Sequence, residues 1–283
     1  MDRKIRLKIK GYRAKDGAGV SLLRVLGHEM VYEYDPILLL DSFDSTNPDD
    51  YTAGFPMHPH RGIETISYVY RGKMIHKDSL GNEDTIGDGE VQWMTAGSGI
   101  LHEEKLPASD RLLGVQIWLN LPAKDKMVPP AYKSIKNDEI KEIEFENGKI
   151  RLLAGFYNGI QGYTSKHLPL NYYDVHLNAN SAIKINTDKD RSIMLFTLVG
   201  DAYIGGELVK EKTAVKLREG DFVEIKASDN YTQVLFLSSK KLDEPIVWGG
   251  PIVMNTKAEL YKAFDDLDNG TFLQDDIAYS LKK

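Results

Sequence analysis

The sequence predicts an all-β protein of two tandem antiparallel barrels or sandwiches, followed by a short C-terminal helix. Short segments of alternating apolar and polar residues, such as residues 65–70 and 112–119, are separated by Gly, Asn and Asp, which is typical of antiparallel sheets. The same pattern returns in residues 193–199, 212–217 and 233–237. The chain has 283 residues, which is long enough for two domains of ordinary size.

A faint internal repeat supports the division into two domains. A turn glycine in residues 70–72 precedes a Gly-Asp turn in residues 87–91, and residues 199–200 precede a similar turn in residues 220–223. The offset between the two pairs is close to one domain length. We expect each pair to form the equivalent hairpin of its domain.

The domain boundary is expected in residues 122–137, where Pro129, Pro130 and several lysines interrupt the strand pattern. We therefore assign residues 1–132 to an N-terminal domain and residues 133–283 to a C-terminal domain.

One helix is predicted close to the C-terminal end. Thr256 and Glu259 have the spacing of a capping box, in which each side chain hydrogen-bonds the backbone of the other residue. Apolar residues then recur on one helical face at Leu260, Ala263, Phe264 and Leu267. The helix is expected to end at Asn269 and Gly270.

Charge and composition exclude several classes of protein. The formal net charge of −6 gives no attraction for nucleic acid, so we expect no direct binding to it. The basic residues Lys4, Arg6, Lys8 and Lys10 alternate with apolar residues, which indicates the solvated face of an edge strand. No apolar run approaches the roughly 18 residues of a membrane span, and the first residues do not resemble a signal peptide. A cytoplasmic location is the expectation.

The chain contains no cysteine, so any metal must bind to histidine nitrogen and carboxylate oxygen. Four of the seven histidines lie between residues 58 and 102. His58 and His60 are two residues apart, and so are His102 and Glu104; on a strand, each pair points to one face. Two such strands placed side by side would direct three imidazoles and one carboxylate at one ion.

Spacing alone leaves two questions open. Glu64 has the same strand parity as His58 and His60, so it competes with Glu104 as the carboxylate ligand. The histidines could also be ordinary core or surface residues that share a region by chance. Two pairs at the same spacing favour the metal site over that interpretation.

Several runs resemble the pirin family of cupins: HPHRGIET at residues 58–65, QWMTAG at 92–97 and GILH at 99–102. Residues 35–41 and 249–256 also resemble pirins, so the resemblance covers nearly the whole chain. It implies that both β-domains are of cupin type, a bicupin, with a metal site in the N-terminal one.

The resemblance also implies the ligand set. By position, His58, His60, His102 and Glu104 would hold iron, with Fe(II) as the expected ion and manganese, nickel, copper or zinc as other occupants. Glu64 would then stand beside the site, where it orients a ligand or handles a proton.

The first functional hypothesis is an iron-dependent dioxygenase of the quercetinase type, an activity of the pirin family. A flavonol-like aromatic substrate and O2 would meet at the metal, with Glu64 or Glu104 as base. Phe55, Met57 and Met94 could form an apolar wall for the substrate, although they could equally belong to the core.

Two alternatives come from other classes. Eukaryotic pirins are nuclear co-regulators that respond to the oxidation state of iron, so this chain could be a non-catalytic regulatory module that binds a protein partner. A cupin metal site could also carry out isomerase or lyase chemistry.

The remaining histidines lack a partner at ligand spacing. His167 and His176 are separated by an odd number of residues, which predicts a C-terminal domain without metal. His28 and His76 are interpreted as structural or exposed.

Overall fold

The computed structural model describes residues 1–274, which form two compact antiparallel β-units. The first unit consists of Arg13–Val31, Ile37–Lys136 and the described residues from Leu242 onward. The second consists of Met1–Tyr12, Tyr32–Pro36 and Asn137–Lys241. A single boundary between residues 132 and 133 would make each unit one continuous stretch of chain. Each unit instead combines three stretches.

The first unit is a sandwich of two sheets. Its seven-stranded sheet has the order β12 (Ala131–Ile135), β9 (Glu90–Thr95), β6 (Ile63–Arg71), β11 (Leu112–Asn120), β4 (Ile37–Ser45), β3 (Val20–Leu26) and β2 (Tyr12–Asp16). Its four-stranded sheet has the order β5 (Phe55–His60), β10 (Ile100–Lys105), β7 (Met74–Asp78) and β8 (Glu83–Ile86). Three short 3-10 helices lie between strands: η1 (His28–Met30), η2 (Pro48–Asp50) and η3 (Ala123–Asp125).

The core of the first unit lies between these two sheets. Phe43 and Val69 of the larger sheet pack in one buried cluster with Met74 and Ile86 of the smaller sheet. Alternation along the strands brings one apolar face of each sheet into this cluster.

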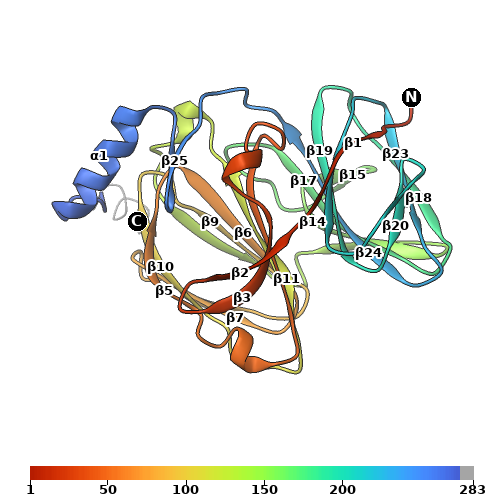
Figure 1. Cartoon of the computed structure of the whole chain (residues 1–283), viewed down its shortest axis with the longest axis horizontal. Coiled ribbons are helices and arrows are strands. Elements are labelled where there is room, and N and C mark those ends of the chain that lie inside the picture. The colour runs from red at the N-terminus through yellow and green to blue at the C-terminus, as the bar shows by residue number, and fades with distance from the viewer. Residues whose placement is uncertain (275–283) are drawn as a thin grey trace. The chain divides into compact units, whose positions relative to one another are not determined.

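The C-terminal segment completes the first unit. It contributes the hairpin β25 (Val247–Gly249) and β26 (Ile252–Met254), followed by helix α1 (Lys257–Asp268), which packs against both strands (Figure 1). The capping box of Thr256 and Glu259 is present, and Asn269 caps the C-terminal end, so the predicted helix is confirmed.

The second unit repeats the sandwich design. Its larger sheet has the order β1 (Ile5–Lys10), β22 (Thr213–Leu217), β19 (Arg191–Val199), β24 (Thr232–Lys240), β17 (Leu170–Leu177), β14 (Gly148–Ala154) and β13 (Lys141–Phe145). Its smaller sheets are β18 (Ala182–Asn186), β23 (Phe222–Ala227), β20 (Ala202–Ile204) and β21 (Glu207–Val209), and the pair β15 (Phe156–Tyr157) and β16 (Ile160–Gln161).

Strand β1 explains why the second unit begins at Met1. It pairs antiparallel with β22, about 200 residues later in the chain, and forms the edge of the sheet (Figure 1). Its apolar residues are half-buried and its basic residues exposed, as the alternation predicts.

Within the described residues, no helix is both long and apolar enough to cross a membrane.

Candidate metal centre

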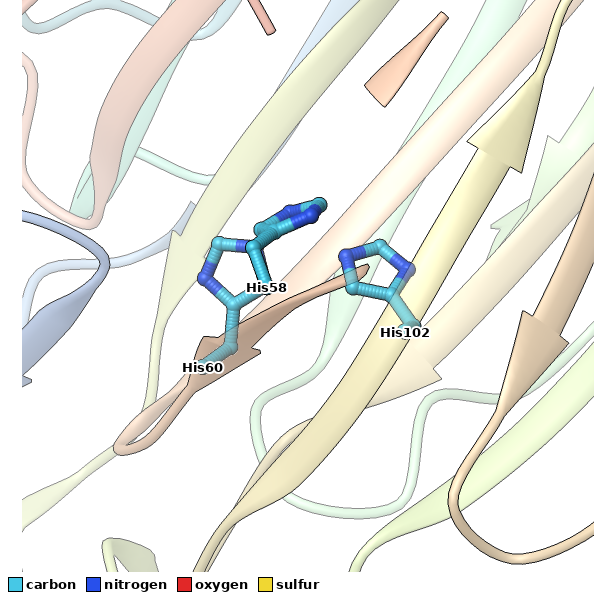
Figure 2. A group of neighbouring side chains, drawn as sticks. All are labelled: His58, His60 and His102. Carbon is cyan, nitrogen blue, oxygen red and sulfur yellow. The ribbon is translucent and has the colours of Figure 1, made fainter. Parts of the chain in front are cut away.

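Three imidazoles converge in the first unit. His58 and His60 lie on β5, and His102 lies on the neighbouring β10, directly opposite His58 in the strand register. One nitrogen of each ring lies within 4.8 Å of the others, and Figure 2 shows the rings facing one another. His60 and His102 are buried, whereas His58 is partly exposed, so the group is reached from the side of His58.

Backbone carbonyls determine which nitrogen of His58 and His60 is free. Nδ1 of His58 lies 2.8 Å from the carbonyl oxygen of Pro56, and Nδ1 of His60 lies 3.0 Å from that of Pro251. A carbonyl oxygen can only accept, so each Nδ1 carries the proton and donates it. Each Nε2 therefore presents a lone pair, the form in which imidazole binds a metal.

The spacing of these lone pairs fits a cation. The Nε2 atoms of His58 and His60 are 3.0 Å apart. Without an ion, the two lone pairs would repel each other at this distance. Two nitrogens that bind one ion at about 2.1 Å each, at a right angle to one another, lie about 3.0 Å apart. Among the described residues, the buried Nε2 of His102 has no hydrogen-bond partner. The group is therefore complementary to a metal ion.

A hydrogen-bonded chain behind His102 fixes its orientation. Its Nδ1 lies 3.5 Å from Nδ1 of His76, whose Nε2 lies 2.8 Å from a carboxylate oxygen of Asp78. The carboxylate accepts the proton of His76 Nε2, so His76 Nδ1 accepts from His102 and leaves His102 Nε2 free. Burial alone would raise the pKa of Asp78, but hydrogen bonds from His76 and Asn82 lower it.

Sequence reasoning missed His76 and Asp78. Both are buried on β7, and the ring of His76 stacks on Tyr132 at 4.1 Å between centroids. The signal was available, because His76 and Asp78 are two residues apart and share a strand face, as His58 and His60 do.

Burial favours the neutral form of His60 and His102. It lowers the pKa of His60 to about 3, with a further contribution from the charge of His58, and it also lowers the pKa of His102. Neutral imidazole does not need to lose a proton before a metal binds.

Glu104 lies beside the three imidazoles but is not one of the mutually close group. The register shifts between His102 and Glu104. Glu104 therefore lies opposite Phe55, whereas a regular antiparallel register would place it opposite Pro56. It is buried, and its Oε1 accepts a hydrogen bond from Gln92 while Oε2 has no hydrogen-bond partner within the described part of the chain. Burial raises the pKa of Glu104. An uncompensated buried carboxylate oxygen is costly unless a cation or proton meets it.

Glu64 lies on the other face of the larger sheet. Its Oε1 accepts from Thr95, whereas Glu104 is bonded by Gln92, and residues 92 and 95 of a regular strand point to opposite faces. This corrects the expectation that Glu64 shares a face with His58 and His60. The parity argument fails because β5 ends at His60 and β6 belongs to a different sheet.

Gly62 makes that change of sheet possible. It has φ of +80°, and a Cβ at this position would lie 2.0 Å from the carbonyl oxygen of Val253. Only glycine fits such a left-handed turn at so close a backbone approach.

Arg61, next to His60, ties the C-terminal segment to the site. Its buried guanidinium donates to the carbonyl oxygens of Ser98 and Phe272 and forms an ion pair with Asp266 of α1 at 2.8 Å. Because Pro251 of the same segment accepts from His60, residues distant in the sequence hold one ligand ring in place.

One indole contacts His60, and a second indole contacts the first. Trp118 meets the ring of His60 edge-to-face at 5.0 Å, and Trp248 lies 5.4 Å from Trp118. Both indoles are partly buried. Neither was singled out from the sequence, and Trp248 could not have been, because it reaches the site from the C-terminal segment.

The three residues expected to form an apolar wall have different positions. Met94 is fully buried in a cluster with Trp118 and Tyr132, and Phe55 packs against another core cluster beside Phe43. Met57 is 48% exposed. The apolar surface next to His60 is therefore formed by Trp118, with Met94 and Trp248 in the same cluster.

The other histidines lie elsewhere. His28 is exposed and contacts Trp248 at 5.5 Å between centroids. In the second unit, Nε2 of His176 bonds Asp174 at 2.8 Å, and Asp174 also accepts from Gln233. The absence of a metal from the second unit stays a prediction.

Two cupin sandwiches with a three-histidine centre in the first define the chain as a bicupin, and such a centre implies a divalent metal. A family model described as Pirin matches residues 19–119, and one described as Pirin C-terminal cupin domain matches residues 172–273. The chain belongs to the pirin family, as the motifs predicted.

Relatives agree with this assignment over most of the chain. A pirin-like protein of Caulobacter vibrioides is 39% identical over 93% of this chain and 97% of its own. Human pirin is 34% identical over 94% of this chain and 93% of its own. The crystal structure of quercetin 2,3-dioxygenase from Acinetobacter baumannii has a TM-score of 0.89 and 32% identity, covering 96% of this chain and 99% of that one.

Proposed function

We propose that the protein is a metal-dependent dioxygenase that cleaves a flavonol-like aromatic substrate with O2, with Fe(II) as its metal. The convergence of three imidazole nitrogens on one point carries this proposal. The similarity to quercetin 2,3-dioxygenase from Acinetobacter baumannii supports the substrate class.

His58, His60 and His102 would hold the metal through Nε2, and Glu104 through Oε2. When bound, the ion would supply a Lewis-acidic point at which an ionised flavonol hydroxyl and O2 come together. Four protein ligands would leave two positions for these reactants on an ion that takes six ligands.

The surrounding residues would position the substrate. Its flat rings would lie against Trp118, which contacts His60, and Trp248, which contacts Trp118; both indoles are partly exposed. Gln92 donates to Oε1 of Glu104 and so orients this carboxylate, which would accept the hydroxyl proton of the substrate. Entry from the side of His58 agrees with its partial exposure.

The choice of carboxylate ligand has a matched pair of variants. We expect Glu104→Gln to lower metal affinity by about tenfold or more, because an anionic oxygen ligand is lost. Glu64→Gln, a change of the same size on the opposite sheet face, should leave affinity within about twofold. Competition titrations with a chelator measure both. Loss of metal in Glu64→Gln with retention in Glu104→Gln would reverse the assignment.

The reaction itself is tested with a flavonol under air. Protein loaded separately with iron, manganese, nickel, copper or zinc should consume O2 and release carbon monoxide in equal amounts, fastest with iron. His102→Ala protein should do neither. If the protein neither consumes O2 nor releases carbon monoxide with any of these metals, the dioxygenase proposal is wrong. Turnover that persists without O2 would instead indicate isomerase or lyase chemistry.

A further inference from the structure

A polar cavity lies within the second unit, and this unit has no role in the proposed reaction. The cavity has a volume of about 480 Å³ and lies where the residues before β1, the start of β19 and the end of β22 meet. This volume is in the usual range for small-molecule sites, roughly 300–1,000 Å³.

The cavity is strongly basic although the chain as a whole is acidic. Eight basic and three acidic side chains line it, against a formal net charge of −6 for the whole chain. Of the described residues that line the cavity, two are apolar: Met1 and Leu217. A concave wall of one charge raises the local concentration of ions of opposite charge.

Four of the basic side chains have no carboxylate partner among the residues that the structure describes: Arg3, Lys216, Arg218 and Lys241. The other four are paired with Asp2, Glu33, Asp221 and Asp188 at 2.7 to 3.6 Å. Nearby carboxylates, including Glu219 and Asp190, act on the charge of Arg3 from beyond ion-pair distance. The unpaired positive charge of the cavity is therefore assigned mainly to the three other cations of this group.

Lys216 is the most unusual of these cations. Its side chain is 3% exposed. Within residues 1–274, its Nζ donates a hydrogen bond to Oγ of Ser192. Burial and the nearby charge of Lys241 lower the pKa of Lys216 to about 8, against the opposing charge of Asp35. An ammonium group has three donors, so two remain for a ligand in a place where water is scarce.

Arg3 fixes the wall of the cavity rather than offering donors to a ligand. Its buried guanidinium donates to Thr187 Oγ1 and to the carbonyl oxygens of Asp188 and Arg218. These bonds join the residues before β19 to those after β22. The charge of Arg3 nevertheless stays beside the cavity.

We infer that this cavity binds a small phosphate-bearing molecule. Lys216 would meet the phosphate at the buried end, with Arg218 and Lys241, both exposed, at the opening. None of the described residues that line the cavity is aromatic; Tyr34, whose ring centroid lies 6.0 Å from Nζ of Lys216, is not among them. Several lining cations suit a doubly charged tetrahedral anion better than a flat aromatic ligand. The site is independent of the histidines of the first unit.

The test is a calorimetric titration of the full chain with inorganic pyrophosphate at low ionic strength, with citrate as a carboxylate of comparable charge. We expect saturable binding of one pyrophosphate per chain, tighter than citrate. The double variant Arg218→Ala/Lys241→Ala should weaken it by about tenfold or more. Lys226→Ala, an exposed lysine of β23 outside the cavity, should leave it unchanged.

The same titration of His102→Ala protein separates this site from the metal centre, where an anion could also bind. Affinity should persist in that variant, and loss of it would place the anion at the metal. The inference is overturned by absence of saturable binding, by equal affinity of the double variant and the unchanged chain, or by tighter binding of citrate than of pyrophosphate.

Discussion

Replacing His102 with alanine should remove the metal. The unchanged protein is expected to carry one equivalent of a divalent transition metal, and His102→Ala should bind it at least about a hundredfold more weakly, because one of three converging nitrogens is lost. Elemental analysis of protein purified without added metal, followed by chelator competition, measures both values.

His28→Ala is the matched control for this change. His28 is exposed and belongs to the same unit, but it is not among the three mutually close histidines. It should retain a full equivalent of metal. Equal metal content in all three proteins, with circular dichroism showing intact sheets, would contradict the ligand assignment.

The second large effect is on stability. Arg61→Ala should lower the free energy of unfolding of the first unit by about 3–5 kcal/mol, because it leaves Asp266 and two backbone carbonyls without their buried partner. All three tryptophans of the chain lie in the first unit, so their fluorescence in a urea titration reports on that unit. Metal affinity should fall as well, since the C-terminal segment also holds His60.

Arg71→Ala provides the comparison. Arg71 lies on β6 of the same unit, is 50% exposed, and has its ion pair with Asp88 at 3.7 Å. An exposed pair of this kind contributes less than about 1 kcal/mol. Similar losses of stability in Arg61→Ala and Arg71→Ala would show that the buried ion pair does not hold the segment.

Much of the centre could be predicted from local sequence pattern. His58 and His60 share a strand, so a separation of two residues was enough to place both rings on one face. The helix after Thr256 could be predicted for the same reason, because its capping box and its apolar face both depend on residues close together in the sequence.

What could not be predicted depends on contacts between distant residues. Strand parity carried Glu64 to the wrong face because it could not foresee that the turn at Gly62 moves the chain into another sheet. Pro251 reaches His60, and Trp248 reaches Trp118 beside it, through a long-range return of the chain. The pairing of β1 with β22 is also non-local, so no single boundary in the sequence could separate the units.

Anomalous X-ray diffraction at a metal absorption edge, from crystals of protein purified without added metal, tests the central claim most directly. We predict one strong peak in the first unit, about 2.0–2.2 Å from Nε2 of His58, His60 and His102 and from Oε2 of Glu104. A peak bound by other residues, or no peak after reconstitution with iron, would contradict it.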